Sequence, residues 1–403
     1  MAKIKEIKAR KIKDSRGQET VEVELEIEKT KVVASCPSGK STGKNEAVAL
    51  SASMAVKNVN KIIAPKLKGA DPSDQKKLDL AMIKLDGTEN KSKLGANAIL
   101  PVSMAICRAG AVAQKLSFYK YINKLSNLKS EILNLKLPLP MFNFIEGGAH
   151  ANNDLDFQEF MVVPQRESFG DNLSIANKIF NNLKDLIVKG YNENKLGDEG
   201  GFAPPISKTE QALLLLKNAI GNEDVAIAID AAASQFYENG KYVLEGREFS
   251  RNVLIDFYKD LTERFKIISI EDPFSEDDWQ GFKELNYQFS ISNFKTFIIG
   301  DDLTTTNVEM IKEAHSKNAC NGIIIKPNQI GTVTESIEAA RLAKSYGWKV
   351  IISHRSGETM DSFIADLSVG LEADFIKSGS PSQPERMVKY SRLMEIENEL
   401  KNE

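Results

Sequence analysis

The sequence predicts an α/β protein: a TIM-type β/α barrel over residues 134–403, preceded by an α+β domain over residues 1–133 that opens with an antiparallel meander. Three observations support this prediction. An alternating run lies near the start of the chain, and short apolar runs followed by amphipathic helical stretches recur after Leu137. The second region holds about 270 residues, close to the roughly 250 typical of such barrels.

The N-terminal domain is predicted from one strand and one helical stretch. Residues 21–28, VEVELEIE, alternate apolar and acidic side chains, which is typical of a strand with one buried face. Residues 95–116 combine apolar and small side chains, which indicates a packed helix interrupted near Pro101. We expect this domain to end near Leu133.

The barrel is predicted from repeated strand-like runs. Seven are clear: LPLPMFNFI, QEFMVVP, VAIAID, KIISIED, FIIGDD, GIIIKP and VIISHR. A short strand before Gly197-Asp198-Glu199 is expected to make eight. An open doubly wound sheet is the structural alternative, but no Gly-rich dinucleotide motif follows any strand and too many strands end in charged residues for one crevice.

The composition limits the possible partners and compartment. The formal net charge of -3 gives no reason to expect nucleic acid or an anionic membrane surface as the main partner. No apolar run approaches the roughly 18 residues of a spanning helix, and the charged start lacks a signal core, so we expect a cytoplasmic protein. Cys36, Cys107 and Cys320 are widely spaced and odd in number, which indicates reduced structural thiols.

Charged residues end five successive strand-like runs. Asp230, Glu271 and Asp301 end three of them, and Lys326 and His354 end the next two. The C-terminal ends of barrel strands share one rim, where barrel enzymes carry their chemistry. Three converging carboxylates without a cysteine favour a hard cation, and Mg²⁺ suits them. The alternative is that each acid caps the following helix.

Lys326 is the candidate base beside this cation site. Neighbouring positive charge and desolvation are expected to lower its pKa, so that the neutral amine becomes available. A surface lysine whose ammonium reaches solvent is the alternative. His354, Arg355 and Ser356 follow the run that we take as strand eight, where barrels often bind phosphate. We therefore expect them to bind an anionic group.

Two glutamates are candidates for general acid chemistry. Glu199 lies in GDEGGF, where glycines let the backbone bend sharply and leave the carboxylate exposed. Glu159, in QEFM, is a plausible partner, since two close carboxylates raise each other's pKa and keep a proton available. An ordinary salt bridge remains the alternative for Glu159.

Taken together, these residues resemble the enolase family. The resemblance runs from about Ile7 to Leu400. Its motifs are DSRG, SGKSTG, NKSKLGANAIL, GGAHANN, QEF, GDEGG, IEDPF, GDDL, KPNQIGT, SHRSGET and IKSG. Such an ordered set is very improbable by chance, and it implies the enolase variant of the barrel.

The resemblance also implies a reaction, the reversible dehydration of 2-phosphoglycerate to phosphoenolpyruvate. In it Lys326 would remove the C2 proton, and Glu199 with Glu159 would help expel the C3 hydroxide. Two Mg²⁺ per active site are implied, the second arriving with the substrate. Removing a proton beside a carboxylate makes a dianion, which concentrated positive charge can stabilise.

The resemblance assigns the remaining site residues as well. Asp230, Glu271 and Asp301 would hold the first Mg²⁺, and Ser41, on a mobile loop, would help hold the second. Lys377 would pair with the substrate carboxylate. The other implied substrate contacts are His150 and Gln158 at the leaving-group end, and His354, Arg355 and Ser356 at the phosphate. A homodimer or homo-octamer is implied too.

The sequence departs from the family pattern at positions that carry no proposed catalytic role. Lys40 stands where Ala is usual, Glu146 where Asn is usual, and Pro101 where Gly is usual. The region after Leu50 is shortened. Gln383-Pro384 also replaces the common Arg-Ser.

Rival functions are weaker. Gly39-Lys40-Ser41-Thr42 resembles the end of a P-loop, but the pattern needs Gly where Ala34 stands. An inactive scaffold or surface adhesin would not need the full set of acids, base and anion ligands. Other barrel enzymes that abstract a proton beside a carboxylate share the three metal acids, but they need no phosphate motifs.

Overall fold

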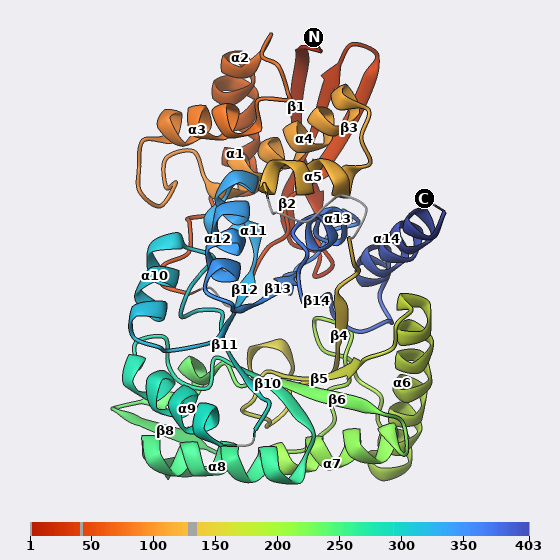
Figure 1. Cartoon of the computed structure of the whole chain (residues 1–403), viewed down its shortest axis with the longest axis vertical. Coiled ribbons are helices and arrows are strands. Elements are labelled where there is room, and N and C mark those ends of the chain that lie inside the picture. The colour runs from red at the N-terminus through yellow and green to blue at the C-terminus, as the bar shows by residue number, and fades with distance from the viewer. Residues whose placement is uncertain (1, 41–42, 128–134, 293, 403) are drawn as a thin grey trace.

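The computed structural model describes residues 2–40, 43–127, 135–292 and 294–402. An N-terminal domain, red to orange in Figure 1, packs on a larger body built around a closed barrel of strands. The predicted fold class is therefore confirmed. The predicted boundary near Leu133 lies outside the described residues.

The N-terminal domain opens with the expected antiparallel meander. Its sheet has the order β1-β2-β3, formed by β1 (Ile4–Lys13), β2 (Glu19–Ile27) and β3 (Thr30–Ser35). Alternate residues of β2 are buried, as the sequence pattern requires of a one-sided sheet. The helical elements are α1 (Ala52–Asn58), η1 (Val59–Ile63), α2 (Ala64–Leu67), α3 (Gln75–Asp86), α4 (Ala96–Gln114) and α5 (Phe118–Ser126).

The interruption predicted near Pro101 is wrong, because α4 continues through that residue. A proline removes one backbone donor, and the nearly complete burial of α4 between Ala96 and Ala111 offsets that cost. By length and composition α4 could cross a membrane, contrary to our expectation for the chain, but 78% of it is buried inside the protein. It is therefore a core helix.

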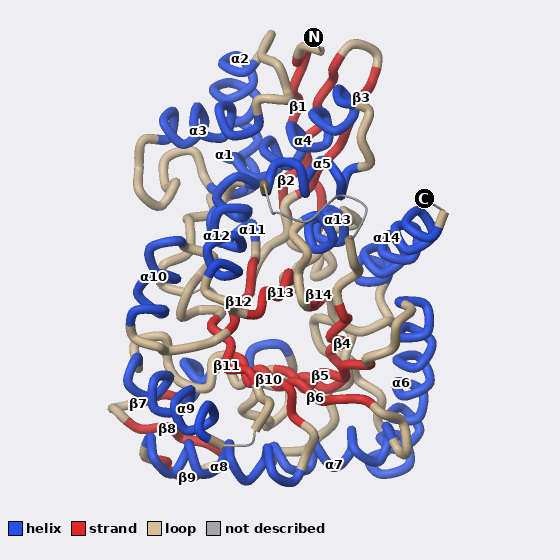
Figure 2. The backbone as a smooth tube through the Cα atoms, viewed as in Figure 1, coloured by secondary structure: helices blue, strands red, loops and turns tan. Residues whose placement is uncertain are grey.

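The barrel closes in the order β10-β11-β12-β13-β14-β4-β5-β6, visible as the ring of red strands in Figure 2. Its strands are β4 (Leu139–Glu146), β5 (Glu159–Pro164), β6 (Val225–Asp230), β10 (Ile267–Glu271), β11 (Phe297–Gly300), β12 (Gly322–Ile325), β13 (Lys349–Ser353) and β14 (Phe375–Lys377). The seven clear runs are confirmed. Apolar side chains of these strands, including Met161 and Ile351, fill the interior.

The eighth strand was assigned wrongly. The segment before Gly197 forms only isolated bridges that involve Leu196 and Phe202, and the eighth strand is β14, which ends at Lys377. His354 therefore follows the seventh strand of the barrel. A run of three residues is too short for periodicity to detect.

One strand runs against the others. β5 is antiparallel to both β4 and β6, whereas the other neighbouring pairs of the barrel are parallel. The first residue of β5, Glu159, therefore pairs with the last residue of β6, Asp230. This orientation brings the start of β5 to the rim where the parallel strands end.

Helices surround the barrel (Figure 1). They are α6 (Phe169–Tyr191), α7 (Thr209–Ile220), α8 (Arg251–Arg264), α9 (Trp279–Ile291), α10 (Val308–Ser316), α11 (Pro327–Ile330), α12 (Val333–Ser345), α13 (Phe363–Gly370) and α14 (Pro384–Lys401). Short elements are η3 (Gly148–His150), η4 (Ala233–Phe236) and the sheet of β7 (Tyr237–Glu238), β8 (Lys241–Leu244) and β9 (Arg247–Phe249).

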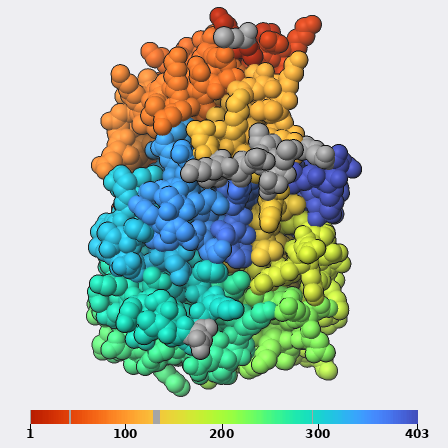
Figure 3. All heavy atoms as spheres, in the orientation of Figure 1, coloured from red at the N-terminus to blue at the C-terminus, as the bar shows by residue number. Residues whose placement is uncertain are grey.

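The two domains pack directly on each other, as Figure 3 shows. Asn123 of α5 donates a hydrogen bond to the carbonyl of Gly370 at the end of α13. Cys36, Cys107 and Cys320 are free and buried, as predicted. The domain interface places the segment after β3 against the segment after β13, because Ser38 pairs in a bridge with Gly357.

Candidate active site

The predicted site residues that the structure describes gather at one rim of the barrel. Asp230, Glu271 and Lys377 are the last residues of β6, β10 and β14. Asp301 and Lys326 directly follow β11 and β12. His354 directly follows β13, so the five residues predicted at strand ends, Asp230, Glu271, Asp301, Lys326 and His354, share this rim as expected. Ser41, the predicted ligand of a second Mg²⁺, lies outside the described residues.

A small cavity at this rim brings most of the predicted side chains together. Its lining residues are His150, Gln158, Glu159, Glu199, Lys326, Ser353, His354, Arg355, Ser356 and Lys377. Ser353 is the one that the sequence did not predict. A larger cavity of about 540 Å³ lies beside residues 43–50 and Asn328, but it contains none of the described catalytic candidates. The smaller cavity is therefore the candidate active site.

Lys377 holds three buried carboxylates of this cavity together. Its Nζ lies 2.8 Å from Glu159, 2.9 Å from Glu271 and 3.3 Å from Asp230. Burial lowers the pKa of Lys377, but these carboxylates outweigh it and raise the pKa well above its ordinary value. Burial conversely raises the pKa of Glu271 and Asp230. Positive charge at this point stabilises the cluster.

A second acidic group surrounds Asp301. The carboxylate of Asp272 accepts the backbone N–H groups of Asp301 at 2.9 Å and Asp302 at 2.7 Å. Ligand atoms of these three residues lie within 4.8 Å of one another. The predicted triad of Asp230, Glu271 and Asp301 is not among the groups of described residues that meet this distance.

The acidic residues nevertheless fit a divalent cation. Their donors are carboxylate oxygens, as Mg²⁺ prefers. Burial, together with the charge of Asp230, raises the pKa of Glu271, and burial together with the charge of Asp302 raises that of Asp272; a bound cation would oppose both shifts. Asp272 is a residue that the sequence analysis missed, although it stands next to Glu271 in IEDP.

Lys326 is held against a predicted metal ligand. Its ammonium contacts the carboxylate of Asp301, and its side chain is only 14% exposed, which excludes the surface alternative. Burial alone lowers the pKa of Lys326, but the charge of Asp301 raises it above the ordinary value. The predicted decrease in the pKa of Lys326 is therefore wrong for this ion pair with Asp301. A cation on Asp301 would compete with the ammonium and shift the pKa the other way.

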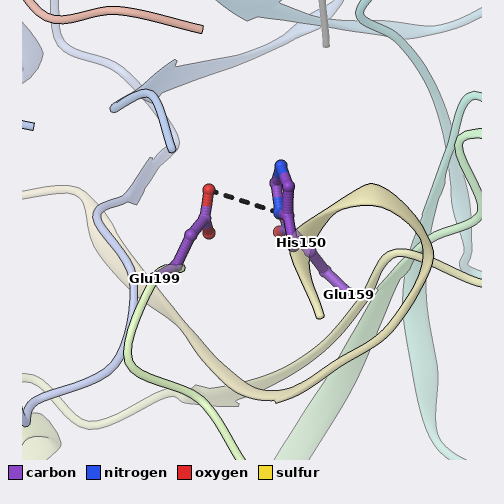
Figure 4. A group of neighbouring side chains, drawn as sticks. All are labelled: His150, Glu159 and Glu199. Atoms are coloured by element: carbon purple, nitrogen blue, oxygen red, sulfur yellow. Dashed lines mark ion pairs between the residues drawn. The ribbon is translucent and has the colours of Figure 1, made fainter. Parts of the chain in front are cut away.

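His150 lies between the two candidate acids (Figure 4). Its Nδ1 is 3.4 Å from Glu159 and 3.5 Å from Glu199. Burial lowers the pKa of His150, but the two carboxylates raise it above its ordinary value. The two carboxylates therefore favour the protonated imidazole.

Glu199 raises the pKa of Glu159 as predicted, but the predicted net increase, which would keep a proton on the pair, is wrong for this structure. Burial raises both values, but His354 and His150 lower the pKa of Glu199 well below its ordinary range. Lys377 and His150 lower the pKa of Glu159 despite its burial. The attraction of Lys377 and of the two imidazoles outweighs the repulsion between the carboxylates. Their side chains are buried, with Glu199 2% exposed rather than open to solvent as predicted.

His354 has a defined tautomer. Its Nδ1 lies 2.6 Å from a guanidinium nitrogen of Arg386, and arginine can only donate. The proton of the neutral ring is therefore on Nε2, which lies 3.1 Å from Glu199. Burial lowers the pKa of His354, consistent with a neutral ring. Arg386 was missed because it lies in the first turn of α14, away from the strand ends that marked the other site residues.

The predicted phosphate ligands adjoin the N-terminal domain. Arg355 donates to both carboxylate oxygens of Glu46, at 2.9 and 3.1 Å. The hydroxyl of Ser356 accepts the backbone N–H of Lys40 at 2.9 Å. Segments from both domains therefore shape this side of the cavity. No sequence signal marked Glu46, which is far from Arg355 along the chain.

Family comparisons agree with this geometry. The model of the enolase C-terminal TIM barrel domain matches residues 134–403, and the model of the enolase N-terminal domain matches residues 4–122. The enolase of Methanocaldococcus jannaschii is 45% identical over 416 residues, covering 98% of this chain and 95% of the relative. The chain belongs to the enolase family. The resemblance inferred from the ordered motifs is thus confirmed, and with it membership of a family of Mg²⁺-dependent lyases.

The side chains of the cavity suit the kind of substrate on which the enolase family acts. The family acts on a small phosphorylated substrate, and the cavity offers the buried cations Lys377 and Arg355 to bind anionic groups. It also places a lysine and a carboxylate–imidazole cluster around the same space.

Proposed function

We propose that this chain catalyses the reversible dehydration of 2-phosphoglycerate to phosphoenolpyruvate and water, with the predicted residues in their predicted roles. One observation supports this most directly. Lys326 and Glu199, proposed to act at C2 and at the C3 hydroxyl, line the same buried cavity. Elimination needs a base and an acid within reach of adjacent carbons.

The metal ligands follow from the acidic residues at the rim. Asp230, Glu271 and Asp301 would hold the first Mg²⁺, and Ser41 would contribute to a second that arrives with the substrate. Bound Mg²⁺ supplies positive charge that stabilises the charge developing on the substrate carboxylate. Lys377, already paired with Asp230 and Glu271, would also bind that carboxylate.

Lys326 would act as the base at C2. For this it must lose its proton, and its contact with Asp301 opposes that loss. Binding of a cation by Asp301 would weaken the ion pair and free the amine. We therefore propose that Lys326 can remove a proton only when a bound cation, instead of the Lys326 ammonium, neutralises Asp301.

The leaving group would meet the cluster of His150, Glu159 and Glu199, with Gln158 beside it. Since His150 has the raised pKa and the glutamates have lowered ones, we propose that the proton for the departing hydroxide is shared by the cluster. Gln158 donates to Asp230 at 3.2 Å, which links this end of the cavity to the metal ligands.

The phosphate would bind at His354, Arg355 and Ser356. Arg355 lies against Glu46, so phosphate binding would compete with that carboxylate for the guanidinium. The backbone and hydroxyl donors around Ser356 would add neutral hydrogen bonds.

The test is the ultraviolet absorbance of purified protein with 2-phosphoglycerate, with and without Mg²⁺. A Mg²⁺-dependent rise from the conjugated enol phosphate is expected. No rise at saturating metal and substrate would contradict the proposal and favour a scaffold or an altered substrate. Proton exchange at C2 of other carboxylates would instead favour a related barrel enzyme.

Three further properties are proposed on family membership. The first domain would end at residue 133 and the second would begin at residue 134. The N-terminal family match ends at residue 122 and the C-terminal match begins at residue 134, which supports this division. The protein would act in the cytoplasm and assemble as a homodimer or homo-octamer. Analytical ultracentrifugation would decide the assembly, with a monomer at micromolar concentration contradicting it.

A further inference from the structure

Two polar side chains of β4 contact Glu199 or its turn and have no role in the reaction described above. Asn143 and Glu146 are both 0% exposed. The other residues of β4 are apolar. Buried polar groups are costly unless they are hydrogen bonded. Both of these side chains direct their hydrogen bonds to Glu199 and its turn.

Asn143 contacts the side chain of Glu199. Its Nδ2 donates to Glu199 Oε2 at 3.1 Å, and a carboxylate accepts only, so the amide orientation is fixed. His354 Nε2 lies 3.1 Å from the same oxygen. Oε2 thus accepts a hydrogen bond from Asn143 and lies against His354, and Oε1 is the oxygen that lies 3.5 Å from His150.

Glu146 contacts the backbone of the same turn. Its Oε1 accepts the N–H of Gly201 at 2.6 Å and its Oε2 accepts the N–H of Glu199 at 3.1 Å. A Cβ on Gly197 would lie 2.3 Å from Glu146 Oε2. The glycine at 197 is therefore required by close packing against this carboxylate, and the turn takes its shape from Glu146.

A β-bulge lets both side chains face Glu199. Three residues apart on a regular strand, Asn143 and Glu146 would point to opposite faces. The pairing of β4 with β5 shifts between Asn143 and Ile145, so that one extra residue stands on β4. Bulges re-aim side chains beside functional sites in this way.

We propose that Asn143 and Glu146 are positioning residues for Glu199: Asn143 fixes Oε2 so that Oε1 faces the leaving group, and Glu146 fixes the backbone of the turn. The inference rests on the proposed function, because it assumes that Glu199 acts in the expulsion of the C3 hydroxide. Neither side chain lines the cavity, so we expect both to act only through Glu199.

The experiment compares two steps of one reaction. Phosphoenolpyruvate formation measures the complete elimination, and deuterium incorporation at C2 of recovered 2-phosphoglycerate in D₂O measures proton removal alone. Asn143→Ala and Glu146→Gln should each lower kcat for elimination about tenfold to a hundredfold, the range expected on losing a hydrogen bond to a charged group. C2 exchange and the KM for 2-phosphoglycerate should change by less than about threefold.

Matched variants separate positioning from folding. Phe144→Leu removes packing of the intervening residue of β4 against Phe180 and should lower thermal stability without changing the ratio of elimination to exchange. Asn143→Leu keeps a similar size without a donor and should reproduce Asn143→Ala if the latter folds poorly. Equal losses in exchange and elimination, or none, would overturn the inference.

A double variant separates this inference from the proposed function. Glu199→Gln should lower elimination and spare exchange, and adding Asn143→Ala should then have little further effect, because Asn143 acts through Glu199. Additive losses would overturn the positioning role while the function stands. Normal elimination by Glu199→Gln would refute the role of Glu199, and wild-type protein without any elimination would refute the function itself; either result removes the inference.

Discussion

Lys326 shows how a single contact determines whether a side chain can serve as a base. Its ammonium touches Asp301, a proposed metal ligand, so proton loss from the lysine and cation binding by the aspartate are linked. Sequence analysis identified both residues from their strand-end positions. It could not find the direction of the pKa shift, because that depends on which of several nearby charges is in contact.

Replacing Lys326 with Ala should reduce C2 exchange by roughly 10²- to 10⁴-fold, the usual worth of a general base. Mg²⁺ affinity should be kept or increased, since a competing cation leaves Asp301. Deuterium incorporation and isothermal titration calorimetry would measure the two effects. Lys349→Ala, at the start of β13 and thus at the opposite rim, is the control. Normal exchange in the variant would refute the assignment.

Asp301→Asn should weaken Mg²⁺ binding by at least about tenfold, the lower range for changes around metal ligands. The reason is the loss of one of the charged oxygens proposed to hold the ion. Titration of purified protein with Mg²⁺ would measure it, with the exposed Asp277→Asn as control. Unchanged affinity in Asp301→Asn would show that the metal site lies elsewhere.

Asp302 gives a pH dependence with a defined sign. Burial and the charge of Asp301 raise the pKa of Asp302 to about 7. Between the ordinary Asp pKa of about 4 in the unfolded chain and the raised pKa of about 7 in the folded protein, Asp302 is protonated only in the folded state. The free energy of unfolding therefore falls as pH rises from about 4 to about 7. Thermal melting with a chelator should show this slope in wild type and a smaller one in Asp302→Asn. Identical slopes would contradict the shift.

Among the strands, the sequence predicted those that carry long apolar runs and the side chains that end them. It failed for β14, whose three residues Phe375–Lys377 are too few to show a period. It also gave no sign that β5 runs antiparallel, because a buried strand shows the same apolar run in either direction. Asn143 and Glu146 stayed hidden for a similar reason: a bulge, visible only in the pairing of β4 and β5, decides which way they face.

The two domains are joined by polar contacts as well as apolar packing. Arg108 of α4 donates to both oxygens of Asp361 in the barrel, at 2.7 and 2.6 Å, and to the carbonyl of Val33. The Asp361 side chain is 7% exposed. Removing one partner of such a pair leaves a charge with little hydration.

Arg108→Ala should therefore lower the free energy of unfolding by about 3 kcal/mol, near the lower end for a broken buried pair. Chemical denaturation would measure it. Arg264→Ala, which removes an ion pair between exposed side chains of α7 and α8, should cost about 0 to 1 kcal/mol. Equal effects of the two substitutions would show that the interdomain pair contributes no more than a surface pair.

The reversed direction of β5 also decides where the chain can be cut or extended. Because Pro164 pairs with Val225 at the start of β6, the connection from β5 to α6 lies at the rim away from the catalytic cavity. New chain termini made by circular permutation, or a fused reporter domain, would be tolerated in that connection, residues 165–167. The same break in the connection from β4 to β5 would separate His150 from Glu159 and destroy the site.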